Sequence, residues 1–181
     1  MSKEFAARRL DIKAFAEEGA HVQGEQRLRE YGRLLAETQG RGAESPVVWT
    51  ASGEIRNPLH VQPEVWLHLQ ANATLPLTCQ RCLASVDVPV SVDRAFRFVS
   101  DEQIAAAQDE ESEEDVLALS RSFDLLELVE DEMLMEMPLA PRHETCPVPV
   151  KLAVEDADFD SVSVQRENPF AVLGKLKSGK S

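Results

Sequence analysis

The chain has 181 residues, of which 43% are hydrophobic, and 19 basic against 32 acidic residues give it a formal net charge of −13. This length and composition allow one domain with a core and appended segments. The charge excludes a uniformly positive nucleic-acid-binding surface, so any contact with RNA would have to be local. It suits a basic protein partner instead. Three cysteines without a secretory pattern, and no apolar stretch of membrane-spanning length, predict a cytoplasmic protein.

The first segment, 1–45, is expected to contribute helices and an edge strand. Asp11 can cap a short helix that begins near Leu10, and Gly19 can end it. The residues His21–Gly24 then predict an edge strand. Apolar and aromatic residues at helical spacing follow and predict a second helix. These residues are Leu28, Tyr31, Leu34 and Leu35.

The second segment, 46–146, is expected to hold the core of the fold. Val47–Ile55 is strand-like, with Ser52-Gly53 as a possible bulge or turn inside it. Apolar and polar residues alternate over Val65–Thr78 and again from Val86 to Val99, which is the period of a strand. The pattern therefore predicts an α+β fold: an antiparallel, partly curved β-sheet or barrel-like meander with flanking helices.

Acidic residues dominate positions 101–115. A dense run of like charges favours a solvated loop without fixed structure, or else a docking surface for a basic protein or an RNA mimic. The strongest predicted helix follows this segment. It begins after Asp124, which can cap it and forms a capping-box-like pair with Glu127, and it ends before Pro138.

Cys79 and Cys82 form a C-x-x-C pair, and His143 and Cys146 form an H-x-x-C pair far downstream. Each pair is short enough to place two ligands on one side of a metal ion. Zinc binds cysteine sulfur and histidine nitrogen in a tetrahedron. The candidate metal ligands are therefore Cys79, Cys82, His143 and Cys146, with zinc as the candidate cofactor, provided that the fold brings the two pairs together.

Two other interpretations of the cysteines stay open. A redox C-x-x-C lies at a helix N-terminus, where the helix dipole lowers the thiol pKa. Strand-like residues follow Cys82, which favours a turn between two strands instead. The thiols can also be ordinary reduced cysteines. The sequence contains no phosphate-binding glycine loop, nucleophile elbow or H-E-x-x-H motif, so we expect a non-enzymatic protein without catalytic residues.

The third segment, 147–181, is expected to be an acidic tether followed by a short amphipathic helix. Asn168 can cap this helix, and Pro169 suits its first position. A tethered amphipathic helix is a common binding element, although a terminal helix can also dock on its own domain or fray. The candidate partner-binding residues are Phe170, Leu173, Leu176, Lys175 and Lys177.

Three pieces of the chain together resemble the bacterial YceD family, in this order and spacing. They are Cys79–Cys82 (CQRC), Asp124–Glu132 (DLLELVEDE) and Asn168–Leu173 (NPFAVL). The family is linked to accumulation of large-subunit ribosomal RNA. The resemblance therefore implies a role in synthesis, processing or stability of 23S ribosomal RNA, without a known catalytic reaction. It does not imply that the cysteine pair binds metal.

The expected partner is a large ribosomal subunit precursor, contacted through its RNA, a basic ribosomal protein or both. Arg81, Arg94 and Arg97 lie near the predicted strands and are the candidate RNA-facing residues. We expect neither a membrane nor a small-molecule substrate as partner. The alternative function is that of a thiol/disulfide redox protein, or of a zinc-stapled interaction protein that binds through its C-terminal helix.

Overall fold

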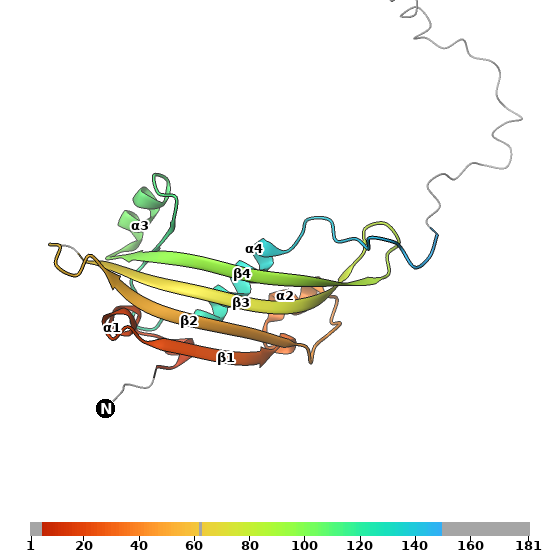
Figure 1. Cartoon of the computed structure of the whole chain (residues 1–181), viewed down its shortest axis with the longest axis horizontal. Helices are drawn as coiled ribbons and strands as arrows, with labels where there is room; N and C mark the ends of the chain where they lie inside the picture. Colours follow the sequence, from red (N-terminus) through yellow and green to blue (C-terminus); the bar gives the residue numbers. More distant parts are fainter. Residues whose placement is uncertain (1–4, 62, 150–181) are drawn as a thin grey trace, which may run out of the picture. The chain divides into compact units, whose positions relative to one another are not determined.

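A five-stranded sheet lies at the centre of the fold in a computed structural model, which describes residues 5–61 and 63–149 (Figure 1). Its strands follow the chain order: β1 (His21–Arg27), β2 (Pro46–Arg56), β3 (Glu64–Thr78), β4 (Ser85–Val99) and β5 (Asp115–Ala118). The first four pair antiparallel, whereas β5 pairs parallel to β4. The predicted α+β class is confirmed, as an open sheet rather than a closed barrel.

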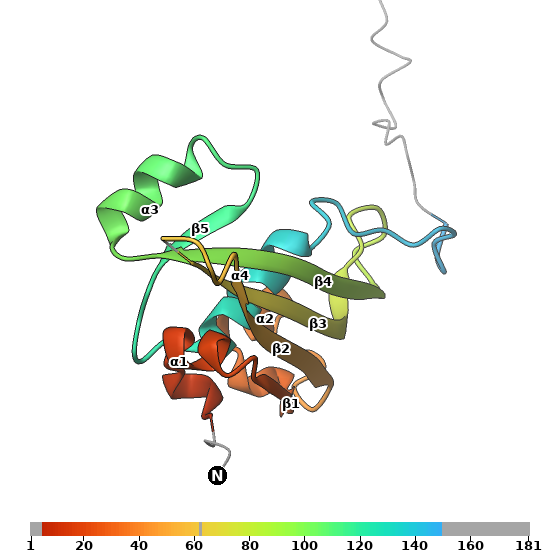
Figure 2. The ribbon, with the colours of Figure 1, turned by 60° about the vertical axis from the view of Figure 1, so that its left-hand side comes forward.

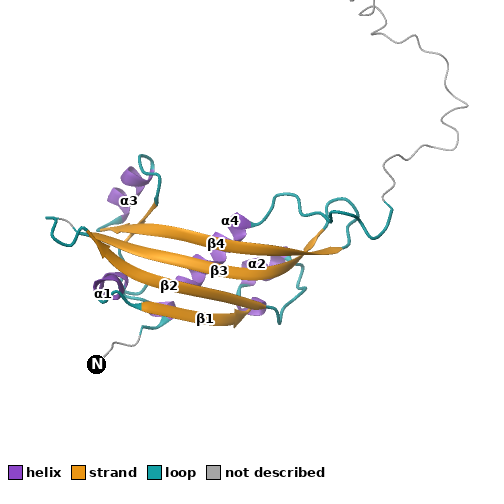
Figure 3. Cartoon of the chain, in the orientation of Figure 1, coloured by secondary structure: helices purple, strands orange, loops and turns teal. Residues whose placement is uncertain are grey.

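Helices cover one face of this sheet. They are α1 (Ile12–Glu17), α2 (Gly32–Glu37) and α4 (Leu125–Glu136), and Figures 1, 2 and 3 show them on the same side of the strands. Two short 3₁₀ turns, Ala7–Arg9 and Leu28–Glu30, precede α1 and α2. The helices bury apolar residues against the strands, and this burial is the main favourable contribution to folding.

The alternation of apolar and polar residues in the predicted strands matches the alternation of buried and exposed side chains in the structure. Leu67, Leu69 and Ala71 of β3 point into the core, while His68 and Gln70 between them are exposed. Because the side-chain period of a strand is two, this pattern also sets which face of the sheet the helices cover.

Gly53 does not mark a turn or bulge, contrary to the expectation from Ser52-Gly53. Strand β2 runs straight through this position, and Gly53 pairs with Leu67 of β3. A Cβ atom at Gly53 would lie 2.7 Å from the Phe15 ring and 2.8 Å from the Ala16 Cα. The glycine is therefore needed because α1 packs directly on the strand there.

The acidic segment after β4 is not a plain loop. It forms α3 (Glu102–Asp109), which Asp101 caps by accepting from the Ile104 N–H at 3.0 Å, and then strand β5. The strand is anchored by Asp109, whose carboxylate accepts from the Val116 N–H at 2.9 Å. The charges that suggested disorder therefore include side chains that satisfy backbone donors.

Two further expectations concern a membrane-spanning helix and the C-terminal helix. No helix in the described part of the chain is long and apolar enough to cross a membrane. The predicted C-terminal helix, with Phe170, Leu173, Leu176, Lys175 and Lys177, lies outside the described residues.

Candidate metal centre

The C-x-x-C pair lies in the turn between β3 and β4, as the strand-like residues after it predicted. The Cys79 N–H donates to the Ala84 carbonyl, and the Leu83 N–H donates to the Cys79 carbonyl, both at 2.9 Å. Leu83 has a φ of 61°, so the chain reverses there through the left-handed region. The turn therefore differs from a redox C-x-x-C motif, which begins a helix.

The chain after α4 crosses to this turn and brings the second pair of ligands with it. The Gln80 N–H donates to the Pro141 carbonyl at 2.8 Å. The Arg81 guanidinium donates to the carbonyls of His143 and Glu144, the latter at 3.1 Å. These bonds join two segments about 60 residues apart in sequence.

The four predicted ligands meet at this point. One ligand atom from each of Cys79, Cys82, His143 and Cys146 lies within 4.8 Å of the others. The Cys82 Sγ lies 3.5 Å from the His143 Nδ1. Ligands held about 2.0–2.3 Å from a tetrahedral zinc ion are separated by roughly 3.3–3.8 Å, so the cluster needs only a small contraction to hold one. Cys79 is fully buried and the other three are half-buried.

The histidine is oriented for metal binding through its Nδ1 atom. Its other nitrogen, Nε2, lies 3.0 Å from the Ser85 carbonyl, which can only accept a hydrogen bond. This contact assigns the proton to Nε2 and leaves the Nδ1 lone pair facing Cys82. Metal-bound histidines commonly donate their second nitrogen to a carbonyl or carboxylate in this way.

The thiols of Cys79 and Cys146 differ in how readily they ionise. Burial opposes ionisation of Cys79, but hydrogen bonds from the backbone of Cys82, His143 and Arg81 outweigh it and lower the pKa of the Cys79 thiol to about 5. Burial raises the pKa of the Cys146 thiol, as do its contacts with the other two sulfurs. Negative charges crowded together disfavour full ionisation, and a bound dication would relieve this repulsion.

Comparison with known proteins identifies the family. Residues 67–177, which include the cluster, most of β3 and all of β4 and β5, match the family described as "Large ribosomal RNA subunit accumulation protein YceD". The chain belongs to the YceD family. A protein of Haemophilus influenzae with this same name is 27% identical over 157 residues, which cover 84% of this chain and 90% of that protein. No solved structure matches significantly.

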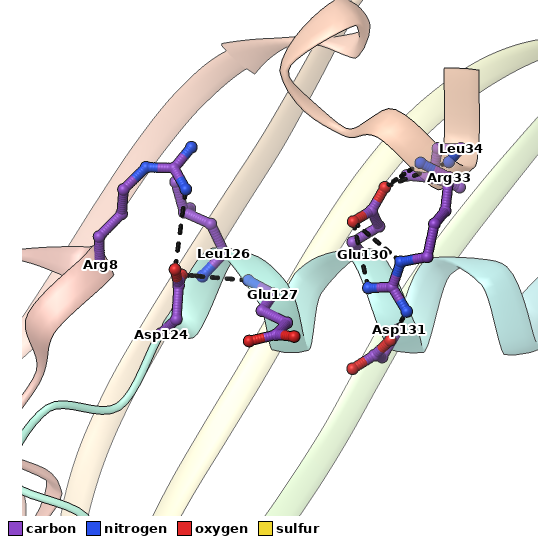
Figure 4. A network of polar contacts seen from close by, with 8 residues as sticks. All are labelled: Arg8, Arg33, Leu34, Asp124, Leu126, Glu127, Glu130 and Asp131. Carbon is purple, nitrogen blue, oxygen red and sulfur yellow. Dashed lines mark hydrogen bonds and ion pairs between the residues drawn. The ribbon is translucent and has the colours of Figure 1, made fainter. Parts of the chain in front are cut away.

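The second family piece, Asp124–Glu132, has a structural role in this YceD family member (Figure 4). Asp124 caps α4 by accepting from the backbone N–H groups of Leu126 and Glu127 at 3.0 and 3.2 Å. Glu130 reaches from α4 to the N-terminus of α2, where it accepts from the Arg33 and Leu34 N–H groups at 2.7 and 3.2 Å. These acids hold helices in place and do not form a free acidic surface.

The guanidinium of Arg33 strengthens the same connection. It contacts the carboxylates of Glu130 and Asp131, and both contacts hold the pKa of Arg33 above its ordinary value. Sequence reasoning did not identify this arginine, because nothing local to α2 indicates that its partners lie on α4.

The three candidate RNA-facing arginines of this YceD family member lie in different surroundings. Arg81 contacts the His143–Cys146 segment, as described above. Arg94 approaches Glu132 of α4 at 3.4 Å, on the helix-covered face of the sheet. Arg97 lies near the far end of β4, where it contacts Gln108 and Ser112. The structure therefore does not bring the three together into one patch.

Proposed function

We propose that this protein supports the accumulation of 23S ribosomal RNA during large-subunit biogenesis as a non-enzymatic binding factor. Membership of the YceD family carries this proposal. Its partner would be a large-subunit precursor. With a net charge of −13, the chain suits a basic ribosomal protein on that precursor better than an extended stretch of RNA phosphates.

We further propose that Cys79, Cys82, His143 and Cys146 bind one zinc ion with a structural role. The donor set of three thiolates and one imidazole is typical of structural zinc sites, in which all four positions come from protein. The oriented imidazole and the lowered pKa of Cys79 both support metal binding. In this protein, the zinc would hold the segment after α4 against the β3–β4 turn.

The oriented imidazole and the lowered pKa of Cys79 also allow a redox function. The reactivity of the thiols distinguishes a redox site from a zinc site. A free Cys79 thiolate would react quickly with an alkylating agent near neutral pH, whereas a zinc-bound one would react only after chelation. We expect protection of all three cysteines in protein purified without chelator, together with one equivalent of zinc. Rapid alkylation of protein that was purified without chelator and carries no zinc would instead favour the redox function.

The cellular role is tested by depletion of the protein. We expect a lower ratio of 23S to 16S ribosomal RNA and a smaller large-subunit peak in a sucrose gradient. Wild-type protein and the exposed-surface variant Lys13→Gln should restore both, whereas the double variant Cys79→Ser/Cys82→Ser should restore them only partly. A normal ratio and normal subunit profiles in depleted cells would overturn the proposed function, whatever the metal content.

A further inference from the structure

Arg81 lies inside the C-x-x-C pair, but its side chain contacts the other half of the cluster. Its Nη2 atom donates to the carbonyls of two residues within the H-x-x-C segment, His143 and Glu144. This nitrogen carries two N–H donors that are held in the guanidinium plane, so a single atom can donate to both carbonyls. No other side chain in the described part of the chain donates to those two carbonyls.

The guanidinium has no carboxylate partner within ion-pair distance among the described residues. Several other arginines do, including Arg33 and Arg94. A charge held on backbone carbonyls beside three sulfur ligands remains available to offset negative charge. A zinc ion with three thiolates and one neutral imidazole carries a net charge of −1, which a neighbouring cation stabilises.

We propose that Arg81 is a positioning residue for the metal centre: it fixes the backbone of the His143–Cys146 segment so that both of its ligands face the β3–β4 turn. This inference rests on the proposed zinc site and assigns a role to a residue that is not itself a ligand. The two contacted carbonyls belong to His143 and to the residue after it. Without these bonds, the segment would lose two of the hydrogen bonds that hold it to the β3–β4 turn. The imidazole contacts with Ser85 and Cys82 would remain, as would the bond from the Gln80 N–H to the carbonyl of nearby Pro141.

The test measures zinc affinity in full-length protein by competition with a chromophoric chelator. Arg81→Gln should bind zinc about tenfold more weakly, which is the usual effect of losing a residue that supports metal ligands. Arg81→Lys should lie between Arg81→Gln and wild type, because an ammonium keeps the charge without the fork. Arg142→Gln is the matched control: the side chain of this neighbouring exposed arginine makes no hydrogen bond or ion pair within the described residues, so the zinc affinity of this variant should equal that of wild type.

Cobalt binding shows whether the variants keep the ligand set. Saturating Co²⁺ should give Arg81→Gln the same tetrahedral absorption bands as wild type, which would exclude loss of a ligand or of the fold. Equal zinc affinity of wild type and Arg81→Gln would overturn the role of Arg81 and leave the zinc site standing. If Arg142→Gln weakened zinc binding equally, the loss of any nearby positive charge would explain the effect, and the positioning role of Arg81 would also be overturned. Wild-type protein that binds neither metal would overturn the zinc site itself.

Discussion

At the scale of single residues, the least expected side chain in this fold is Glu132 of α4. It is only 5% exposed, although glutamate is rarely buried, and its carboxylate lies 3.4 Å from the Nε of Arg94. Burial raises the pKa of Glu132, and the nearby Arg94 offsets only part of this rise because its side chain is itself 47% exposed. The charged form of Glu132 is therefore less favourable in the folded protein than in the unfolded chain.

This shift makes the stability of the protein depend on pH in a defined direction. A group whose folded pKa is raised contributes stability that is present below its unfolded pKa and is lost as the pH rises through its folded pKa. Glu132→Gln cannot ionise, so the free energy of unfolding of this variant relative to wild type should increase from pH 4 to pH 7. Chemical denaturation at a series of pH values measures this difference. A constant difference would show that the ion pair with Arg94 cancels the effect of burial, and a difference that decreases with pH would show that the ion pair outweighs it.

At the scale of elements, α2 depends on another helix for its N-terminus. It has only six residues, its N-cap residue Tyr31 makes no side-chain cap, and helices this short are unstable on their own. Glu130 supplies the missing cap from α4, and its side chain is 13% exposed. The connection therefore fixes how α2 and α4 lie against each other on the sheet.

Glu130→Ala removes this cap and leaves the Arg33 and Leu34 N–H groups without their acceptor. We expect a loss of about 0.5–2 kcal/mol in the free energy of unfolding, the usual cost of removing a helix N-cap. Glu127→Ala is the control on the same helix, because only the backbone of Glu127 takes part in capping. Urea denaturation of both variants measures the effect. Equal stability of the two would show that water replaces the carboxylate at no cost.

The elements differ in how far their sequences predict them. The four long strands and α4 were predictable because alternation, capping residues and Pro138 act locally. Strand β5 and α3 were not predictable from the sequence. Acidic residues dominate the composition of this segment, and contacts with β4, which stabilise it, are not visible in the local sequence. The reason for Gly53 was equally hidden, since the helix that requires it lies more than thirty residues earlier in the chain.

At the scale of the whole molecule, the cluster of Cys79, Cys82, His143 and Cys146 joins distant parts of the chain. Cys82 and His143 are 61 residues apart in sequence. The sequence spacing indicated two ligand pairs, Cys79 with Cys82 and His143 with Cys146. Only the path of α4 across the sheet shows that the two pairs meet. The hydrophobic core, in contrast, is formed by the sheet and the three helices and includes none of the cysteines.

Metal removal should therefore loosen one end of the molecule and leave the rest folded. After chelation, we expect faster hydrogen exchange in 79–85 and 139–146, with little change in the central residues of β2 and β3, whose ladder bonds and buried side chains do not depend on the cluster. Exchange followed by mass spectrometry measures this, and Cys146→Ser should give the same pattern without chelator. Faster exchange throughout the sheet would mean that the metal stabilises the whole fold, and unchanged exchange would mean that the hydrogen bonds of Gln80, Arg81 and His143 hold the two segments together alone.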